Sequence, residues 1–261
     1  MSGPTRLGAV RYLNAAPIVY GLDEDPRFTV LRETPAVLAD LLHAGSIDLG
    51  LIPSIEYASS DYRIVPGIAI ASRGPVRSVS LFHRVPLADV QTVAVDASSR
   101  TSVALLKVLL AEGLGQPAYV VMPPRLDEML ARAEAALLIG DPALAGSTTV
   151  PRLDLGEEWT ARTGLPFVYA FWAGPEGAAP AGTVERLQQA LRAGLGAIPR
   201  IALAFDGNVP GQAADNEAYL RSNIVYRFGE AEQAGLREFY RRAHALGLIA
   251  RVPELRFLGD S

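Results

Sequence analysis

The sequence contains no cysteine. This absence excludes disulfide bonds, thiolate metal ligands and cysteine nucleophiles. It also lacks an excess of positive charge, because 24 lysines and arginines face 28 acidic residues and the net charge is −4. The arginines are scattered and form no basic block, so we expect no nucleic-acid partner. A small anionic ligand is still compatible with this charge, because a single pocket can be positive on an acidic protein.

Long hydrophobic runs are also missing. No apolar stretch reaches the length needed to span a bilayer, so we expect no membrane partner. The first residues, Met1 to Arg6, are polar, and only Leu7 to Val10 follow as an apolar run before Arg11. Such a start lacks the hydrophobic segment of a secretory signal peptide, and it leads us to expect a cytoplasmic protein.

Metal and nucleotide motifs are absent as well. The three histidines, His43, His83 and His244, have no second histidine or acid at metal-ligand spacing. No P-loop, glycine-rich dinucleotide fingerprint or nucleophile elbow occurs. The sequence therefore predicts neither a metal nor a cofactor.

The chain does contain two similar α/β units. In the first, strands are expected at 7–12, 28–32 and 47–52, with helices at 15–21 and 35–44. In the second, strands are expected at 92–95, 119–122 and 135–139, with helices at about 99–112 and 126–132. Each unit thus alternates β-α-β-α-β, which favours parallel sheets with helices on both faces.

Three extended segments lie outside these units, at 64–71, 76–82 and 166–173, and three helices follow at 184–198, 216–223 and 230–246. Extended segments at the junctions suggest that the chain crosses between two lobes. We therefore predict a two-lobed α/β fold like that of type II periplasmic binding proteins, with mostly parallel sheets and a ligand cleft between the lobes. Residues 1–83 and 174–261 would form lobe 1, and residues 84–173 would form lobe 2. The alternative is two sequential α/β domains without a shared hinge.

Ligands of open parallel sheets collect at the carboxyl ends of the strands. There the most specific feature is a run of hydroxyl side chains at the start of the predicted helix 99–112. Free backbone N–H groups and hydroxyls at a helix start attract a carboxylate or phosphate. Helix capping would need only one hydroxyl. We therefore predict an anion site formed by Ser98, Ser99, Arg100, Thr101 and Ser102.

Other polar residues follow the remaining strands. Asn14 and Ser54 could each cap a helix or contact a ligand. Asp141 could cap a turn, hold the cleft shut through a hydrogen bond, or contact the substrate. Either Ser78 or Ser80 could face the cleft from the crossing segment, because the strand register is open.

Five segments together resemble the menaquinone-biosynthesis family, and within it the chorismate dehydratases. The segments occur in the family's order at Arg11 to Pro17, Gly45 to Tyr57, Ser98 to Val103, Leu138 to Leu144 and Asp154 to Val168. The resemblance implies that chorismate loses water to give 3-[(1-carboxyvinyl)oxy]benzoate, with Asn14 and Ser78 as catalytic residues. It implies a dicarboxylate substrate, bound by Ser54, the Ser98 to Ser102 segment and Asp141, and no cofactor.

Three alternatives stay open at this point. The family's paralogue that makes 1,4-dihydroxy-6-naphthoate has the same fold, and a catalytic histidine near the cleft would favour it, with His83 as the candidate. A solute-binding protein for a small carboxylate would have the same anion site. A ligand-binding domain of a transcription regulator would need a helix-turn-helix segment, and none precedes Leu7. The sequence is compatible with a monomer or a homodimer.

Overall fold

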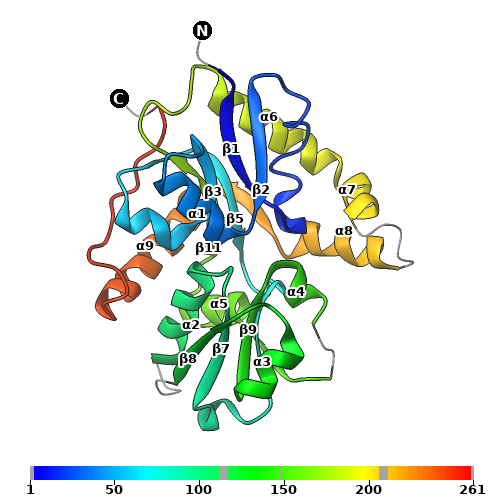
Figure 1. Cartoon of the computed structure of the whole chain (residues 1–261), viewed down its shortest axis with the longest axis vertical. Helices are drawn as coiled ribbons and strands as arrows, with labels where there is room; N and C mark the ends of the chain where they lie inside the picture. Colours follow the sequence, from blue (N-terminus) through cyan, green and yellow to red (C-terminus); the bar gives the residue numbers. More distant parts are fainter. Residues whose placement is uncertain (1–2, 112–116, 147–148, 206–210, 260–261) are drawn as a thin grey trace.

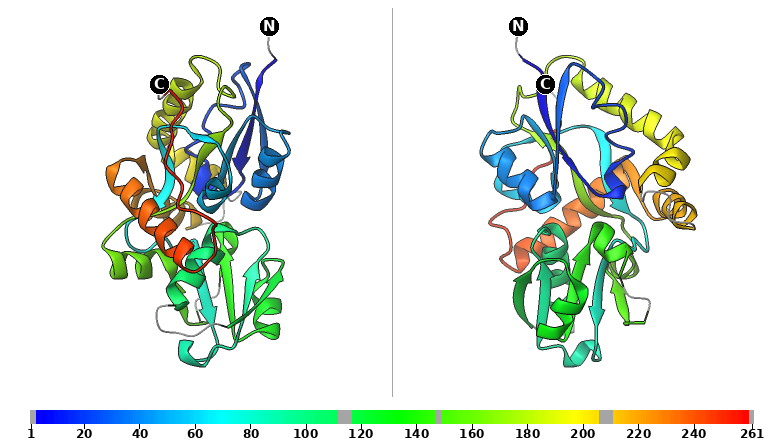
Figure 2. Two further views of the ribbon diagram at one scale, coloured as in Figure 1. Left: turned by 90° about the vertical axis from the view of Figure 1, so that its left-hand side faces the viewer. Right: turned by 45° about the vertical axis from the view of Figure 1, so that its right-hand side comes forward.

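Two lobes, each built on its own β-sheet, make up the computed structural model of the chain (Figure 1). The structure describes residues 3–111, 117–146, 149–205 and 211–259. Both ends of the chain lie on the same lobe, away from the sheet that contains β7, β8 and β9 (Figure 2). The fold is thus the predicted two-lobed α/β architecture.

The first sheet contains strands from both ends of the sequence, in the order β12-β5-β11-β3-β1-β2, with β4 paired to β11. Its strands are β1 (Thr5–Val10), β2 (Phe28–Glu33), β3 (Leu49–Pro53), β4 (Arg63–Ile64), β5 (Gly67–Ser72), β11 (Phe167–Gly174) and β12 (Val225–Phe228). Strand β1 pairs with β2 and β3 in parallel, as the first α/β unit predicts. Strand β11 is antiparallel to β3 and β5.

The second sheet has the order β10-β6-β9-β7-β8. Its strands are β6 (Val79–His83), β7 (Thr92–Asp96), β8 (Ala118–Met122), β9 (Ala135–Ile139) and β10 (Arg152–Asp154). Strand β7 is parallel to β8 and β9, whereas β6 is antiparallel to β9 and β10. Both sheets are therefore mixed, and the prediction of mostly parallel sheets is wrong because the crossing strands run against their neighbours.

Sheet membership also corrects the predicted lobe limits. The first limit, at residue 83, assigned β6 to lobe 1, but β6 pairs with β9 and β10 of the second sheet. The second limit, at residue 173, assigned β11 to lobe 2, but β11 lies in the middle of the first sheet. Backbone pairing decides both cases, because an apolar strand carries no local mark of the sheet that it joins.

The helices follow the apolar patterns closely. Their bounds are α1 (Pro35–His43), α2 (Thr101–Ala111), α3 (Leu126–Arg132), α4 (Gly140–Leu144), α5 (Leu155–Thr163), α6 (Thr183–Gly196), α7 (Ile198–Phe205), α8 (Gln212–Ser222) and α9 (Glu230–Ala245), with 3-10 turns η1 (Leu13–Ala15), η2 (Ser54–Ser59) and η3 (Leu87–Asp89). The predicted helix at 15–21 is wrong: η1 takes its place and tight turns follow. The predicted end of the helix 99–112 lies outside the described residues.

The lobes share one hydrophobic core on the side of α2, α5 and α9. Phe239 of α9 packs edge-on against Trp159 of α5, with ring centroids 6.2 Å apart, and Arg242 stacks on the same indole. Both Phe239 and Trp159 are fully buried. This contact joins α9 to α5 at the junction of the lobes. Within the described ranges, no helix combines the length and the apolar character needed to cross a bilayer.

Candidate active site

A cleft lies where the two lobes meet, at the ends of β1, β7 and β9 and beside β11. It holds about 500 Å³ of empty space, counting the part that opens to solvent. Its walls come from both lobes: Val10, Tyr12, Asn14, Pro35, Pro53, Ile70, Tyr169 and Ala170 on one side, and Ser78, Val79, Ser99, Arg100, Thr101, Ser102, Ile139 and Gly140 on the other.

The predicted anion segment forms one wall of this cleft. Ser99, Arg100, Thr101 and Ser102 line it, and α2 begins at Thr101. The first N–H groups of a helix have no partner inside that helix, so they are available to an anion. No hydrogen bond among the described residues uses the hydroxyl of Ser99 or Ser102. These hydroxyls and N–H groups together suit a carboxylate.

Ser98, the first residue of that segment, has a different position. It does not line the cleft, and its hydroxyl donates to Asp96 Oδ1 at 2.7 Å. The Tyr12 hydroxyl lies 3.0 Å from the same Ser98 oxygen. Ser98 thus connects a tyrosine of the cleft wall to a buried carboxyl group.

Asp96 itself was not singled out from the sequence. It is 1% exposed, and its Oδ2 has no hydrogen-bond partner among the described residues. Burial raises the pKa of Asp96 above the ordinary value, and the hydrogen bonds from Ser98 only partly offset this effect. As the last residue of β7, Asp96 is indistinguishable in sequence from an ordinary strand end.

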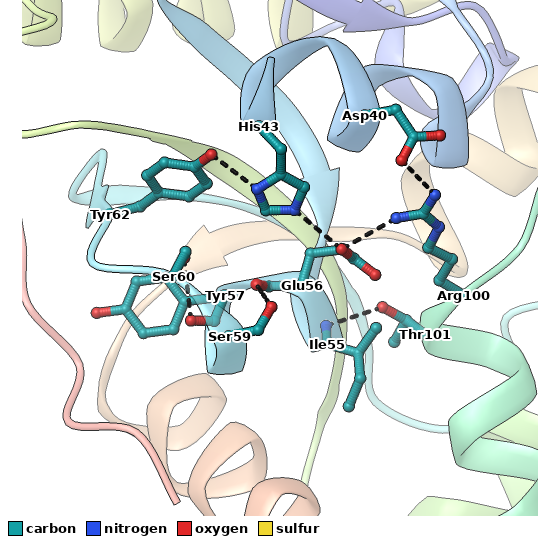
Figure 3. A network of polar contacts seen from close by, with 10 residues as sticks. All are labelled: Asp40, His43, Ile55, Glu56, Tyr57, Ser59, Ser60, Tyr62, Arg100 and Thr101. Carbon is teal, nitrogen blue, oxygen red and sulfur yellow. Dashed lines mark hydrogen bonds and ion pairs between the residues drawn. The ribbon is translucent and has the colours of Figure 1, made fainter. Parts of the chain in front are cut away.

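Arg100 carries the charge of the anion segment, but two carboxylates already hold its guanidinium (Figure 3). Nη2 lies 2.6 Å from Asp40 of α1, and Nη1 lies 3.0 Å from Glu56 of η2. Glu56 also contacts His43 Nε2 at 3.1 Å, and Tyr62 OH lies 2.9 Å from His43 Nδ1. Because Asp40 and Glu56 belong to the first lobe, this network ties the lobes together at the edge of the cleft.

Asn14 and Ser78 also line the cleft, and both form hydrogen bonds with the hydroxyl of the buried Tyr219 of α8. The Tyr219 hydroxyl donates to Ser78 Oγ at 2.7 Å. Asn14 Oδ1 is buried and has no partner among the described residues. Ser80, the alternative to Ser78, is fully buried, donates to the Arg77 carbonyl and does not line the cleft.

Ser54 and Asp141 lie outside the lining of the cleft. Ser54 is fully buried, and its hydroxyl donates to the Val168 carbonyl at 2.8 Å. Asp141 Oδ1 accepts a hydrogen bond from the Leu13 backbone N–H at 3.0 Å, which joins the two lobes. Both side chains therefore support the walls of the cleft from behind.

Tyr219 was missed because its contact with the cleft is not local in sequence. The hydroxyl reaches Ser78 across 141 residues of chain. Within α8, Tyr219 is one apolar position among others, and no motif surrounds it. Only the packing of α8 against η1 makes its position evident.

No histidine lines the cleft within the described part of the chain. His83 ends β6 opposite Ala135, the first residue of β9, whereas the cleft is at the other end of that strand pair, at Val79 and Ile139. Four residues of extended chain span about 13 Å. The histidine expected for the naphthoate-forming alternative is therefore not supplied by His83.

Comparison with known proteins agrees with this architecture. Residues 5–245 match a family model described as menaquinone biosynthesis. A chorismate dehydratase from Thermus thermophilus is 35% identical over 266 residues, covering 94% of this chain and 96% of that protein.

Solved structures with low identity share the fold. A protein from Archaeoglobus fulgidus superposes with a TM-score of 0.74 at 19% identity, covering 94% of this chain and 98% of that one. The alkanesulfonate-binding protein SsuA from Xanthomonas axonopodis pv. citri gives a TM-score of 0.65 at 16% identity, covering 97% and 96%. The fold is thus that of periplasmic binding proteins, and by sequence the chain belongs to the menaquinone-biosynthesis family.

Proposed function

We propose that this protein is a chorismate dehydratase, a hydro-lyase that removes water from chorismate to give 3-[(1-carboxyvinyl)oxy]benzoate. The observation that carries the proposal is the combination of two sites in one cleft. The start of α2 offers hydroxyls and N–H groups that suit a carboxylate. In the same cleft, Asn14 and Ser78 offer an amide and a hydroxyl that suit a ring hydroxyl. The relative from Thermus thermophilus has the same activity by name.

The elimination needs a base for the C3 proton and assistance to the departing 4-hydroxyl. Asn14 and Ser78 cannot act as the base, and no histidine lines the described cleft. A carboxylate of the substrate therefore takes the C3 proton. The C3–C4 double bond forms as the C4–O bond breaks, and the proton leaves with the hydroxyl as water. Because the ring becomes aromatic, the enzyme needs only to orient the groups and stabilise the charge on the departing oxygen.

Mixing the purified protein with chorismate, without metal or cofactor, tests the proposal. Chromatography with mass detection should show the loss of one water with the enolpyruvyl ether retained. Intact chorismate with saturable binding would favour a solute-binding protein, the class to which SsuA belongs. Intact chorismate without binding would redirect the search to the substrate of the naphthoate-forming paralogue.

A further inference from the structure

The hydrogen bond from Tyr219 determines which further hydrogen bonds the Ser78 hydroxyl can form. Tyr219 is 1% exposed, and its hydroxyl donates to Ser78 Oγ at 2.7 Å. A serine hydroxyl has one proton to donate and two lone pairs to accept. Because Ser78 Oγ accepts from Tyr219, its own proton remains available, and no other hydrogen bond of the described residues uses it. Ser78 lines the cleft. It can therefore act as a hydrogen-bond donor toward a ligand.

Asn14 can act as a hydrogen-bond acceptor toward a ligand. Its backbone is held in place because the Tyr226 hydroxyl donates to the Asn14 carbonyl at 3.0 Å. Its side-chain Oδ1 is buried without a partner among the described residues. The Asn14 side-chain amide also forms a hydrogen bond with the Tyr219 hydroxyl. Since Tyr219 gives its only proton to Ser78, Asn14 can interact with it only as a donor, through its NH₂ group. This orientation leaves Oδ1 as an acceptor.

We propose that Tyr219 is a positioning residue that fixes the direction of these hydrogen bonds, so that Asn14 presents an acceptor and Ser78 a donor to one hydroxyl of the substrate. A hydroxyl group needs both, because it donates one proton and accepts on its lone pairs. As the C–O bond breaks, negative charge develops on that oxygen, and the hydrogen bond from Ser78 strengthens. This inference rests on the proposed dehydration of chorismate.

The surroundings keep Tyr219 in the donor form. Burial raises the pKa of its phenol well above the usual value, and the nearby charge of Asp141 raises it further. The hydrogen bonds with Ser78 and Asn14 lower the pKa but do not reverse the shift. A phenol that does not ionise always has a proton for Ser78. Its role is therefore to orient neighbouring groups and not to exchange protons.

The experiment compares wild type with Tyr219→Phe, which removes the hydroxyl and keeps the buried ring. Tyr57→Phe is the matched control, because Tyr57 is also buried and its hydroxyl donates to the Glu254 carbonyl at 2.9 Å, away from the cleft. Steady-state kinetics on chorismate give kcat and KM. Calorimetric titration gives the affinity for the product, 3-[(1-carboxyvinyl)oxy]benzoate, which has the carboxylates but no ring hydroxyl.

We expect kcat of Tyr219→Phe to fall by roughly tenfold to a hundredfold, while product affinity stays within about twofold of wild type. Tyr57→Phe should keep the wild-type kcat. A Tyr219→Phe variant with wild-type kcat would overturn the inference. Equal losses of kcat and product affinity would also overturn it, because they would show a distorted cleft. Failure of wild type to convert chorismate would instead refute the proposed function, and the inference with it.

Discussion

The hydroxyls of Tyr12 and Ser98 lie 3.0 Å apart, although 86 positions of sequence separate them and they belong to different lobes. Ser98 gives its proton to Asp96, so Tyr12 must be the donor in this contact. The junction of the lobes is thus connected by hydrogen bonds to the buried carboxyl group of Asp96 at the end of β7.

The first prediction concerns the pH dependence of stability at Asp96. Its pKa is raised in the folded protein, so the stability that it contributes is fully present below the ordinary value of 3.8 and is lost as the pH rises through the raised pKa. Asp96→Asn cannot ionise. The urea midpoint of this variant should therefore decline less than that of wild type between about pH 4 and pH 7. Asp89→Asn, at an exposed position of the same lobe, should follow the wild-type curve; equal slopes for all three proteins would contradict the prediction.

Gly140→Ala tests the packing between the lobes. Gly140 has a φ of +61°, and a Cβ there would lie 2.5 Å from Cδ2 of the Tyr12 ring. Gly164→Ala is the control, because Gly164 has a φ of +70° but open space around it. Both variants should lose about 1 kcal/mol of stability to the left-handed backbone. Only Gly140→Ala should also raise KM for chorismate, by about tenfold or more. Equal KM values in the two variants would show that the contact between residue 140 and the Tyr12 ring does not affect substrate binding.

Asp40→Asn should weaken the ion-pair network of Arg100 (Figure 3). The pair joins two lobes at a partly exposed site, so its loss should cost at most about 1 kcal/mol and raise KM by up to about fivefold. Asp23→Asn is the control, because Asp23 pairs with Arg32 inside one lobe at similar exposure. X-ray scattering at low salt should show a larger radius of gyration for Asp40→Asn only. The prediction fails if both variants scatter like wild type.

Asn14→Ala should abolish turnover and leave chorismate binding within about tenfold, or ~1.4 kcal/mol, of wild type. The reason is that, in the proposed mechanism, Asn14 acts on the departing hydroxyl and the start of α2 supplies most of the binding. Titration calorimetry with chorismate measures the affinity, and product formation measures the turnover. Asn223→Ala removes an amide that holds the Pro75 carbonyl outside the cleft and should remain active. Full activity of Asn14→Ala would end the proposed role.

Local patterns predict much of this fold. The sequence pattern places a helix at 126–132 and a strand at 135–139, and the structure has α3 and β9 at those residues. Sheet membership is harder, because β6 is buried from Val79 to Phe82 and its pattern would fit either sheet. Its place depends on pairing with β9, more than 50 residues later, and no local pattern encodes that choice.

The candidate site, too, could be predicted from the sequence only in part. The strand-end rule selected Asn14 and the Ser99 to Ser102 segment, and these residues line one cleft. Ser78 also lines it, but the sequence pattern left Ser78 and Ser80 open, and only the family resemblance favoured Ser78. The rule also selected Ser54, whose hydroxyl donates a hydrogen bond to the Val168 carbonyl and does not line the cleft. It missed Tyr219, because a tyrosine inside a helix is usually a packing residue and only the tertiary contact with Ser78 distinguishes it.

The contacts between the lobes also have a kinetic consequence. Tyr12 meets Ser98, Leu13 meets Asp141, and Arg100 joins two carboxylates, so these bonds must break before the lobes can separate. We expect a ligand as large as chorismate to enter the cleft only when the lobes have separated. Entry is then preceded by a first-order opening step. In stopped-flow experiments the observed rate of association should level off at high ligand concentration. The plateau would report how often the lobes separate, whichever ligand is used.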